Sequence, residues 1–363
     1  MPPDLGGGTL AAVSRATTLT IPLPFRAVRS MMRLGGHLPP GLLGVASRIC
    51  PVNSDGEHIA PEMLVAGVAT RLVPGGDMSG KTVERARRNL EVNSAISAER
   101  TPPLAVVEDL VIDGPGGDLP ATRYRAEVSS RGLVLFFHGG GFSLGSRASH
   151  DAYCRRLALD TGADVLSVDY RLAPEHPFPA AVDDALAAWR FAVSTAPRWG
   201  VDTTRLIVAG DSAGGNLAAV LSRLVRGEEV TPCLQLLLYP VTDMTRTAGS
   251  RQEFATGYFL TTERIEWFTE RYVPAGVERS DPRISPLLAD DLTGLPPAHV
   301  VVAGFDPLRD EGIAYADALS GAGVRTSLQR ESGMIHGFVN MLGFSPAARQ
   351  AVSGMHDVVR GVL

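Results

Sequence analysis

The chain of 363 residues contains little cysteine and almost no lysine. Its three cysteines, Cys50, Cys154 and Cys233, are odd in number and widely separated, which fits neither a disulfide framework nor the ligand spacing of a metal site. Because Cys233 begins an apolar run, we expect it to be buried, and a reducing cytoplasmic location is the best fit. Lys81 is the only lysine, a bias that is typical of a high-GC bacterial genome and uninformative about mechanism.

The sequence also lacks charged tails and long apolar runs. A net charge of −5 gives no reason to expect nucleic acid as a partner. No uninterrupted apolar stretch reaches the roughly 18 residues that are needed to span a bilayer, and a start with Asp4 and glycines at 6–8 does not resemble a secretory signal. What remains is an ordinary globular composition, 45% hydrophobic, with material for a sizeable core.

Residues 1–54 are the exception to this composition. They carry five arginines, with apolar residues between them, against the single acid Asp4. One interpretation is a surface helix that is attracted to anionic lipid and associates weakly with a membrane surface. The other interpretation, which we favour, is a lid helix that packs on the body of the protein.

The order of predicted elements is that of an α/β protein. Residues 56–100 are predicted to be helical, and 105–125 to form an antiparallel hairpin. Strands and helices then alternate, which implies a mostly parallel central sheet flanked by helices. The later strands are predicted at 132–137, 163–169, 205–209, 234–239, 298–303 and 325–330, and the helices at 152–161, 180–194, 213–226, 309–322 and 346–363.

One long excursion, at about 241–296, interrupts this alternation and contains one predicted helix at 262–272. An insertion of that length is usually functional, typically a lid over a binding site. We therefore divide the chain into an N-terminal helical cap segment, 1–100, and an α/β domain, 101–363, that carries a cap insertion.

Residues 206–215 form an apolar run that ends at a serine between glycines. Gly210-Asp-Ser212-Ala-Gly214 is the G-x-S-x-G pattern of a strand that turns sharply into a helix. Glycines at this turn remove the Cβ atoms that would collide with neighbouring backbone. The turn would hold Ser212 Oγ clear of the sheet, at the positive end of the following helix, as a nucleophile requires.

Acyl transfer at a serine needs a base and an acid that orients the base, and in enzymes with this pattern the acid precedes the histidine. Asp306 directly follows an apolar strand and is the candidate acid; the alternative is that it caps the helix that begins near Arg309. His336, in a glycine-bounded loop after the last strand, is the candidate base. A histidine with a pKa of about 6.5 can accept a proton at neutral pH.

A second glycine-rich motif, His138-Gly-Gly-Gly-Phe142, ends a buried strand. Backbone N–H groups in such a loop can reach a carbonyl oxygen because no side chain obstructs the approach, and the N–H of Ala213 would add a donor. We expect His138 to hold the loop by a hydrogen bond. A glycine-rich loop can instead cradle phosphate, but no Walker-type sequence follows and no dinucleotide fingerprint is present.

With HGGG, GDSAGG, DPL and a late His-Gly-Phe in this order, the chain resembles the hormone-sensitive-lipase-like esterases, the bacterial family IV enzymes of the α/β-hydrolase superfamily. The segments at 169–179, 238–240 and 281–286 strengthen the resemblance, which covers roughly residues 100–363. It implies an α/β-hydrolase fold with a helical cap. By position it implies Ser212 as nucleophile, His336 as general base and acid, and Asp306 as its orienting partner. The oxyanion hole would consist of Gly139, Gly140, Gly141 and Ala213.

The resemblance also implies an activity: hydrolysis of small-molecule carboxylic esters with short to medium acyl chains, without a metal or another cofactor. It suggests a homodimer that pairs through the sheet edge or the last helix. Two alternatives remain open. The same triad acts on amides, lactones or acetylated compounds in other enzymes, and some proteins of this fold are non-catalytic ligand receptors, which typically lack the histidine.

The walls of an apolar acyl pocket are expected among large residues near these motifs, with plain core packing as the alternative for each. The candidates are Phe142, Tyr239, Tyr258, Phe259, Leu260 and Trp267. Asp211 and Glu175 are expected to make structural hydrogen bonds or ion pairs, for example with Arg171. The turn that contains Asp281 and Ser285 is expected to brace the site.

Overall fold

The computed structural model describes residues 50–64 and 82–363. Its described part is built on one eight-stranded sheet in the order β1-β2-β4-β3-β5-β6-β7-β8. The β1–β2 and β2–β4 pairs are antiparallel and every later pair is parallel, so the predicted mostly parallel sheet is confirmed. The strands are β1 Val106–Gly114, β2 Gly117–Arg125, β3 Leu133–Phe137, β4 Asp164–Val168, β5 Leu206–Asp211, β6 Leu234–Leu238, β7 Ala298–Phe305 and β8 Thr326–Ile335.

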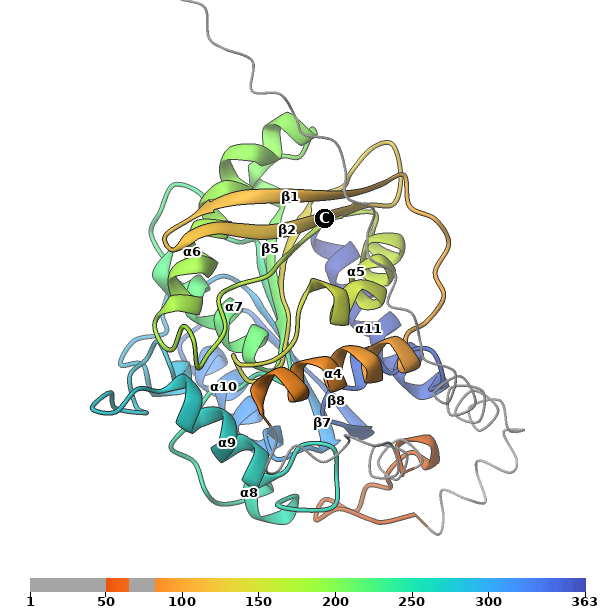
Figure 1. Ribbon diagram of the computed structural model, residues 1–363, viewed down its shortest axis with the longest axis vertical. Coiled ribbons are helices and arrows are strands. Elements are labelled where there is room, and N and C mark those ends of the chain that lie inside the picture. Colours follow the sequence, from red (N-terminus) through yellow and green to blue (C-terminus); the bar gives the residue numbers. More distant parts are fainter. Residues whose placement is uncertain (1–49, 65–81) are drawn as a thin grey trace, which may run out of the picture.

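Helices cover both faces of this sheet (Figure 1). One face packs against α6, α7 and α10, and the other against α5 and α11. Two further helices, α4 and α9, lie toward the lower end of the molecule in Figure 1. The helices are α4 Val83–Ser97, α5 Arg147–Thr161, α6 Ala180–Thr195, α7 Ala213–Leu224, α8 Ser250–Glu253, α9 Thr262–Tyr272, α10 Arg309–Gly321 and α11 Pro346–Val362.

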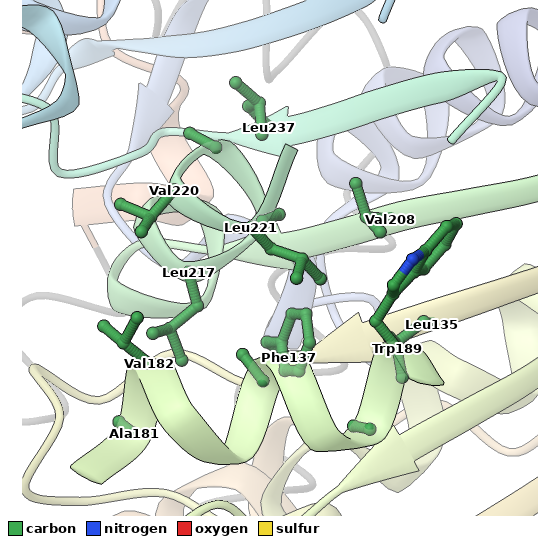
Figure 2. Packing of buried hydrophobic residues seen from close by; sticks show 14 of the residues in the cluster. Leu135, Phe137, Ala181, Val182, Trp189, Val208, Leu217, Val220, Leu221 and Leu237 are labelled. Carbon is green, nitrogen blue, oxygen red and sulfur yellow. The ribbon is translucent and has the colours of Figure 1, made fainter. Parts of the chain in front are cut away.

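The central strand β3 shows how the sequence produces these two layers. All five of its residues are buried. Successive side chains point to opposite faces of a sheet, so Leu135 and Phe137 join the core cluster under α6 and α7, whereas Val134 and Phe136 join the cluster under α5 and α11. Figure 2 shows the first cluster, with Trp189 of α6 among its members. A strand that is covered on both faces therefore has a continuously apolar sequence.

Two element boundaries differ from the predictions for identifiable reasons. The helix predicted at 152–161 begins earlier, at Arg147, because Ser146 and Ser149 cap it reciprocally through side-chain to backbone hydrogen bonds. The strand predicted at 325–330 continues to Ile335, which pairs with Phe305 beyond an irregularity in β7. His336 therefore follows a strand directly instead of lying in a longer loop.

The N-terminal expectations are tested only in part. Residues 1–49, which contain nearly all of the basic and apolar segment, and residues 65–81 lie outside the described residues. Within 56–100 the structure has α4 and a helical turn at 61–64, preceded by a bridge between Val52 and His58, and residues 56–60 and 98–100 are not helical.

No described helix is both long and apolar enough to cross a membrane. Cys50 and Cys154 are buried, but Cys233 is only half-buried, which corrects the expectation for that residue. It directly precedes Leu234, the first residue of β6, at the amino end of the strand.

Candidate active site

Four segments that carry chemistry follow the carboxyl ends of four parallel strands. Residues 139–141 follow β3, Ser212 follows β5, Asp306 follows β7 and His336 follows β8. Parallel strands end at one edge of a sheet, which is where α/β folds place their ligands. We call these four segments the sheet-edge loops.

Ser212 occupies a strained turn between β5 and α7. Its backbone has φ 55° and ψ −116°, a conformation that a residue with a side chain rarely adopts. The turn is held by a 2.8 Å hydrogen bond from the Ser212 amide to the Leu238 carbonyl. A Cβ atom at Gly214 would overlap the Phe137 carbonyl oxygen, so only glycine allows α7 to approach β3 this closely. Strain of this kind persists only where the surrounding structure enforces it.

The side chains of Ser212, His336 and Asp306 form one chain of hydrogen bonds. Ser212 Oγ lies 2.9 Å from His336 Nε2, and His336 Nδ1 lies 2.7 Å from Asp306 Oδ2. All three residues are buried. Because a carboxylate only accepts hydrogen bonds, Nδ1 carries the ring proton and Nε2 is left to accept the proton of the serine hydroxyl. The arrangement can therefore deprotonate Ser212.

Asp306 makes two contacts with its two carboxylate oxygens. Oδ2 faces His336, and Oδ1 accepts a 2.9 Å hydrogen bond from the amide of Leu308, just before α10. The contact with the start of the helix and the contact with the histidine are thus compatible. Together they fix both oxygens of a fully buried carboxylate.

The glycine-rich loop after β3 lines a cavity beside Ser212. Gly140 has φ 125°, and a Cβ there would overlap the Leu144 carbonyl oxygen, so this position requires glycine. The amides of Gly140, Gly141 and Ala213 donate no hydrogen bond to any described residue. They remain available to a ligand oxygen.

Asp211 supports this loop from behind. Its Oδ1 accepts a 2.7 Å hydrogen bond from the Gly139 amide and lies 3.0 Å from His150 Nε2. Burial alone would raise the pKa of this carboxyl group, but the interaction with His150 and the hydrogen bonds from His150 and Gly139 together lower the pKa below its ordinary value. A buried negative charge therefore holds the loop in place.

His138 is the other anchor of the loop. Its Nδ1–H donates to the Gly139 carbonyl at 2.9 Å, and its ring stacks on Tyr170 with centroids 4.3 Å apart. Burial lowers the pKa of His138 to about 4, so the ring is neutral at neutral pH. The expected hydrogen bond between His138 and the loop is present.

Asp211 and Glu175 make the structural hydrogen bonds and ion pairs expected of them, but Arg171, the example given as a partner, was wrong. Arg171 instead makes an ion pair with Asp184, and Glu175 makes one with Arg87 on α4. Ion pairs between segments distant in the sequence depend on which helices lie over which loops, and neighbouring sequence does not contain that information.

Three of the six expected pocket residues line the cavity: Phe142, Phe259 and Leu260. The other three belong to its surroundings. The Tyr239 ring packs on the His336 ring from within the core, with centroids 4.8 Å apart. Tyr258 packs on Phe254 and Phe305, and Trp267 is covered by the guanidinium of Arg271. None of these three residues lines the cavity, and of the three only Tyr239 is fully buried in the core.

Sequence reasoning missed Phe268, which lies against Gly141 and lines the cavity. On α9 the residues that line the cavity include Ile265, Phe268 and Tyr272. Their spacing of three and four residues is the period of one helix face. That period would have selected Phe268 in place of its neighbour Trp267.

The turn that contains Ser285 contacts a cavity wall, in keeping with the bracing expected of it. Ser285 Oγ accepts a 2.8 Å hydrogen bond from the amide of Met244, which lines the cavity. The Ile284 carbonyl accepts a hydrogen bond from Asn216 of α7, also at 2.8 Å. The turn thus joins the helix after Ser212 to the cavity wall.

Comparisons with known proteins identify a family and relatives of this chain. The family model described as alpha/beta hydrolase fold matches residues 134–340. The carboxylic ester hydrolase LipN of Mycobacterium tuberculosis is 48% identical over 252 residues, 67% of this chain and 67% of the relative. The ethyl acetate hydrolase of Pseudomonas putida is 39% identical over 285 residues, 75% of this chain and 90% of the relative. Among solved structures, a hyperthermophilic esterase from the archaeon Pyrobaculum calidifontis matches with a TM-score of 0.78 and 39% identity, over 84% of this chain and 98% of that one.

Proposed function

The chain belongs to the alpha/beta hydrolase family, among its hormone-sensitive-lipase-like esterases, and on this premise we propose that it hydrolyses small-molecule carboxylic esters through a covalent acyl-enzyme. The observation that carries the proposal is the hydrogen-bonded chain from Ser212 through His336 to Asp306. It lies beside three backbone amides that donate to no described residue. The relatives' names, carboxylic ester hydrolase and ethyl acetate hydrolase, favour esters over amides and lactones.

In the first half of the proposed reaction, Ser212 Oγ attacks the carbonyl carbon of the ester while His336 Nε2 takes its proton. The carbonyl oxygen becomes negatively charged and accepts hydrogen bonds from the amides of Gly140, Gly141 and Ala213. When the carbon–oxygen bond to the alcohol breaks, His336 gives the proton to the leaving oxygen. Ser212 is then esterified by the acyl group.

In the second half, a water molecule attacks the acyl carbon and His336 takes one of its protons. The bond to Ser212 Oγ breaks, the oxygen recovers the proton from His336, and the carboxylic acid leaves. Asp306 holds the imidazole in the required tautomer throughout and stabilises the imidazolium that forms twice in each cycle.

The proposal predicts that Ser212→Ala lowers kcat for 4-nitrophenyl butanoate by at least about 10⁴-fold, because the nucleophile is lost. The melting temperature should stay close to that of the wild type. Replacing all three residues should lower kcat little further, since they act as a unit. Steady-state kinetics and thermal unfolding measure both outcomes.

Ser222→Ala is the matched control, because Ser222 is buried in α7 and, among the described residues, its hydroxyl bonds only to the Ala218 carbonyl of the same helix. It should keep nearly full activity. A 4-nitrophenyl phosphonate should label the wild type once, at Ser212, as seen by mass spectrometry. Substantial turnover by Ser212→Ala, or labelling at another residue, would overturn the assignment of the nucleophile.

A further inference from the structure

The helix α4 presents an unexpected face to the cavity. Its cavity-lining residues are Ala86, Asn89, Leu90, Asn93, Ser94 and Ser97, of which four are polar. Its apolar residues Val92 and Ile96 face the protein core instead. A helix that covers an apolar cavity only as packing is expected to turn its apolar stripe inward. Packing alone therefore does not explain the polar stripe.

The other walls of the cavity have a different character. They are formed mainly by large apolar side chains, among them Met244, Phe259, Leu260, Ile265, Phe268 and Leu308. Ser212 and His336 lie in the same cavity. A molecule bound at the serine thus contacts a hydrogen-bonding wall as well as an apolar one.

Contacts at both ends hold α4 in place. Arg87 donates to the Ser143 carbonyl at 2.9 Å and the Ala173 carbonyl at 3.0 Å, and it pairs with both oxygens of Glu175. At the other end, the Gly343 amide donates to the Ser97 carbonyl at 2.8 Å. The stripe between these anchors has a defined position in the wall of the cavity.

Asn93 lies at the centre of the stripe. It follows Ala86 by seven residues and precedes Ser97 by four, so all three lie nearly above one another on the helix. Its half-buried amide makes no hydrogen bond to any described residue. An amide offers two donors and an acceptor, and burying it against apolar groups is unfavourable unless a partner is supplied.

We infer that the α4 wall binds an oxygen atom of the substrate, so that the preferred esters carry an ether, hydroxyl or carbonyl oxygen at a distance from the ester group that is cleaved. Asn93 is the residue that selects such esters over alkyl esters of the same length. This inference rests on the proposed function, because it names the substrate class of the same site. It gives Asn93 no part in the chemical step.

The test compares pairs of esters in which one methylene is replaced by oxygen. In the acyl arm, 4-nitrophenyl 4-methoxybutanoate is compared with 4-nitrophenyl hexanoate. In the alcohol arm, 2-ethoxyethyl butanoate is compared with pentyl butanoate. For each pair the ratio of kcat/KM, oxygenated over alkyl, is measured in the wild type and in Asn93→Leu.

Loss of one hydrogen bond should lower this ratio about three- to tenfold in Asn93→Leu. The decrease should come chiefly from KM, and it should occur for the pair of esters whose varied part, acyl or alcohol, contacts α4. A decrease confined to one arm supports the inference and identifies the part of the substrate that contacts α4. Asn93→Ala should lower the ratio as well. Both esters of a pair are measured on the same sample, so a partly unfolded variant does not distort the ratio.

Arg88→Leu is the matched control, since Arg88 is exposed on the same helix, and it should leave both ratios unchanged. If Asn93→Leu and Asn93→Ala hydrolyse all four esters with wild-type ratios, the inference is wrong and the proposed function stands. If the wild type hydrolyses none of the esters and the phosphonate does not label Ser212, the proposed function itself fails.

Discussion

The sheet-edge loops and the two helices that close the cavity, α4 and α9, are held by different kinds of interaction. In the loops, Asp306 is fully buried and both of its oxygens are bonded, and the Asp211 carboxylate holds the Gly139 amide in the protein interior. Besides packing and backbone hydrogen bonds, the helices are held by exposed ion pairs. The side chains of the Arg87–Glu175 pair are 26% and 47% exposed, and those of the Arg279–Glu266 pair at α9 are 41% and 48% exposed.

This difference has a physical consequence. A hydrogen bond to a buried charge is strong and expensive to break, whereas an exposed ion pair is weakened by water and salt. Changes that remove a buried charge or displace the backbone at the sheet-edge loops should therefore lower kcat and stability together. Changes in α4 and α9 should act mainly on substrate binding.

The largest effect that distinguishes the two regions is expected from Gly140→Ala. The new Cβ would overlap the Leu144 carbonyl, and the residue would have to keep a positive φ, so the loop must shift and misplace its amides. Loss of one oxyanion donor lowers kcat by about 10²–10³-fold. Steady-state kinetics with 4-nitrophenyl butanoate measure the change.

Gly276→Ala is its matched control. Gly276 also has a positive φ, of 85°, but a Cβ there meets no atom within 4 Å. Its variant should lose a little stability and almost no activity. A Gly140→Ala enzyme with wild-type kcat would show that the loop after β3 is as adaptable as the helices.

Asp211→Asn should have an intermediate effect. The carboxylate charge that holds the loop is lost, which should lower kcat about tenfold and the free energy of unfolding at pH 7 by about 2 kcal/mol. The pKa of Asp211 is lowered in the folded protein. Its stabilising contribution is therefore present above the unfolded carboxyl pKa and is lost as pH falls through the folded pKa.

Denaturant unfolding at pH 7 and at acidic pH tests this pH dependence. The wild type and Asp211→Asn should differ less in free energy of unfolding at acidic pH than at pH 7. Asp118→Asn, at an exposed residue of the β1–β2 hairpin, should change neither kcat nor stability. If the loss of unfolding free energy in Asp211→Asn relative to the wild type became larger toward acidic pH, the assigned role of the carboxylate would be contradicted.

The smallest effect is expected from Arg87→Ala. The variant loses a half-exposed ion pair and the hydrogen bonds to the Ser143 and Ala173 carbonyls, so the free energy of unfolding should fall by about 1 kcal/mol. Because α4 loses its anchor beside Ser143, KM for 4-nitrophenyl hexanoate should rise about two- to threefold while kcat stays near the wild-type value. Arg279→Ala removes the exposed pair at α9 as a comparison. A large loss of kcat in Arg87→Ala would mean that α4 takes part in the chemistry and that the two regions are not distinct.

The sequence by itself determined the fold class and placed Ser212, Asp306 and the glycine loop just after strands and His336 in the loop after the last strand, whereas the extension of that strand to Ile335 came from the structure. Each of these segments carries a local signal, because a sharp turn, a close backbone approach or a buried strand restricts the residues that can occupy it. The order of the segments along the chain then points to one edge of a parallel sheet.

Only the tertiary structure decided which side chains surround that edge. An aromatic residue packs equally well in a core or in a cavity wall, so its identity did not separate Phe268 from Trp267, or Phe259 from Tyr258. The partners of Asp211 and the polar face of α4 depend on how helices distant in the sequence pack over the sheet. Those orientations come from the packing of the whole domain, and no short segment of the chain contains them.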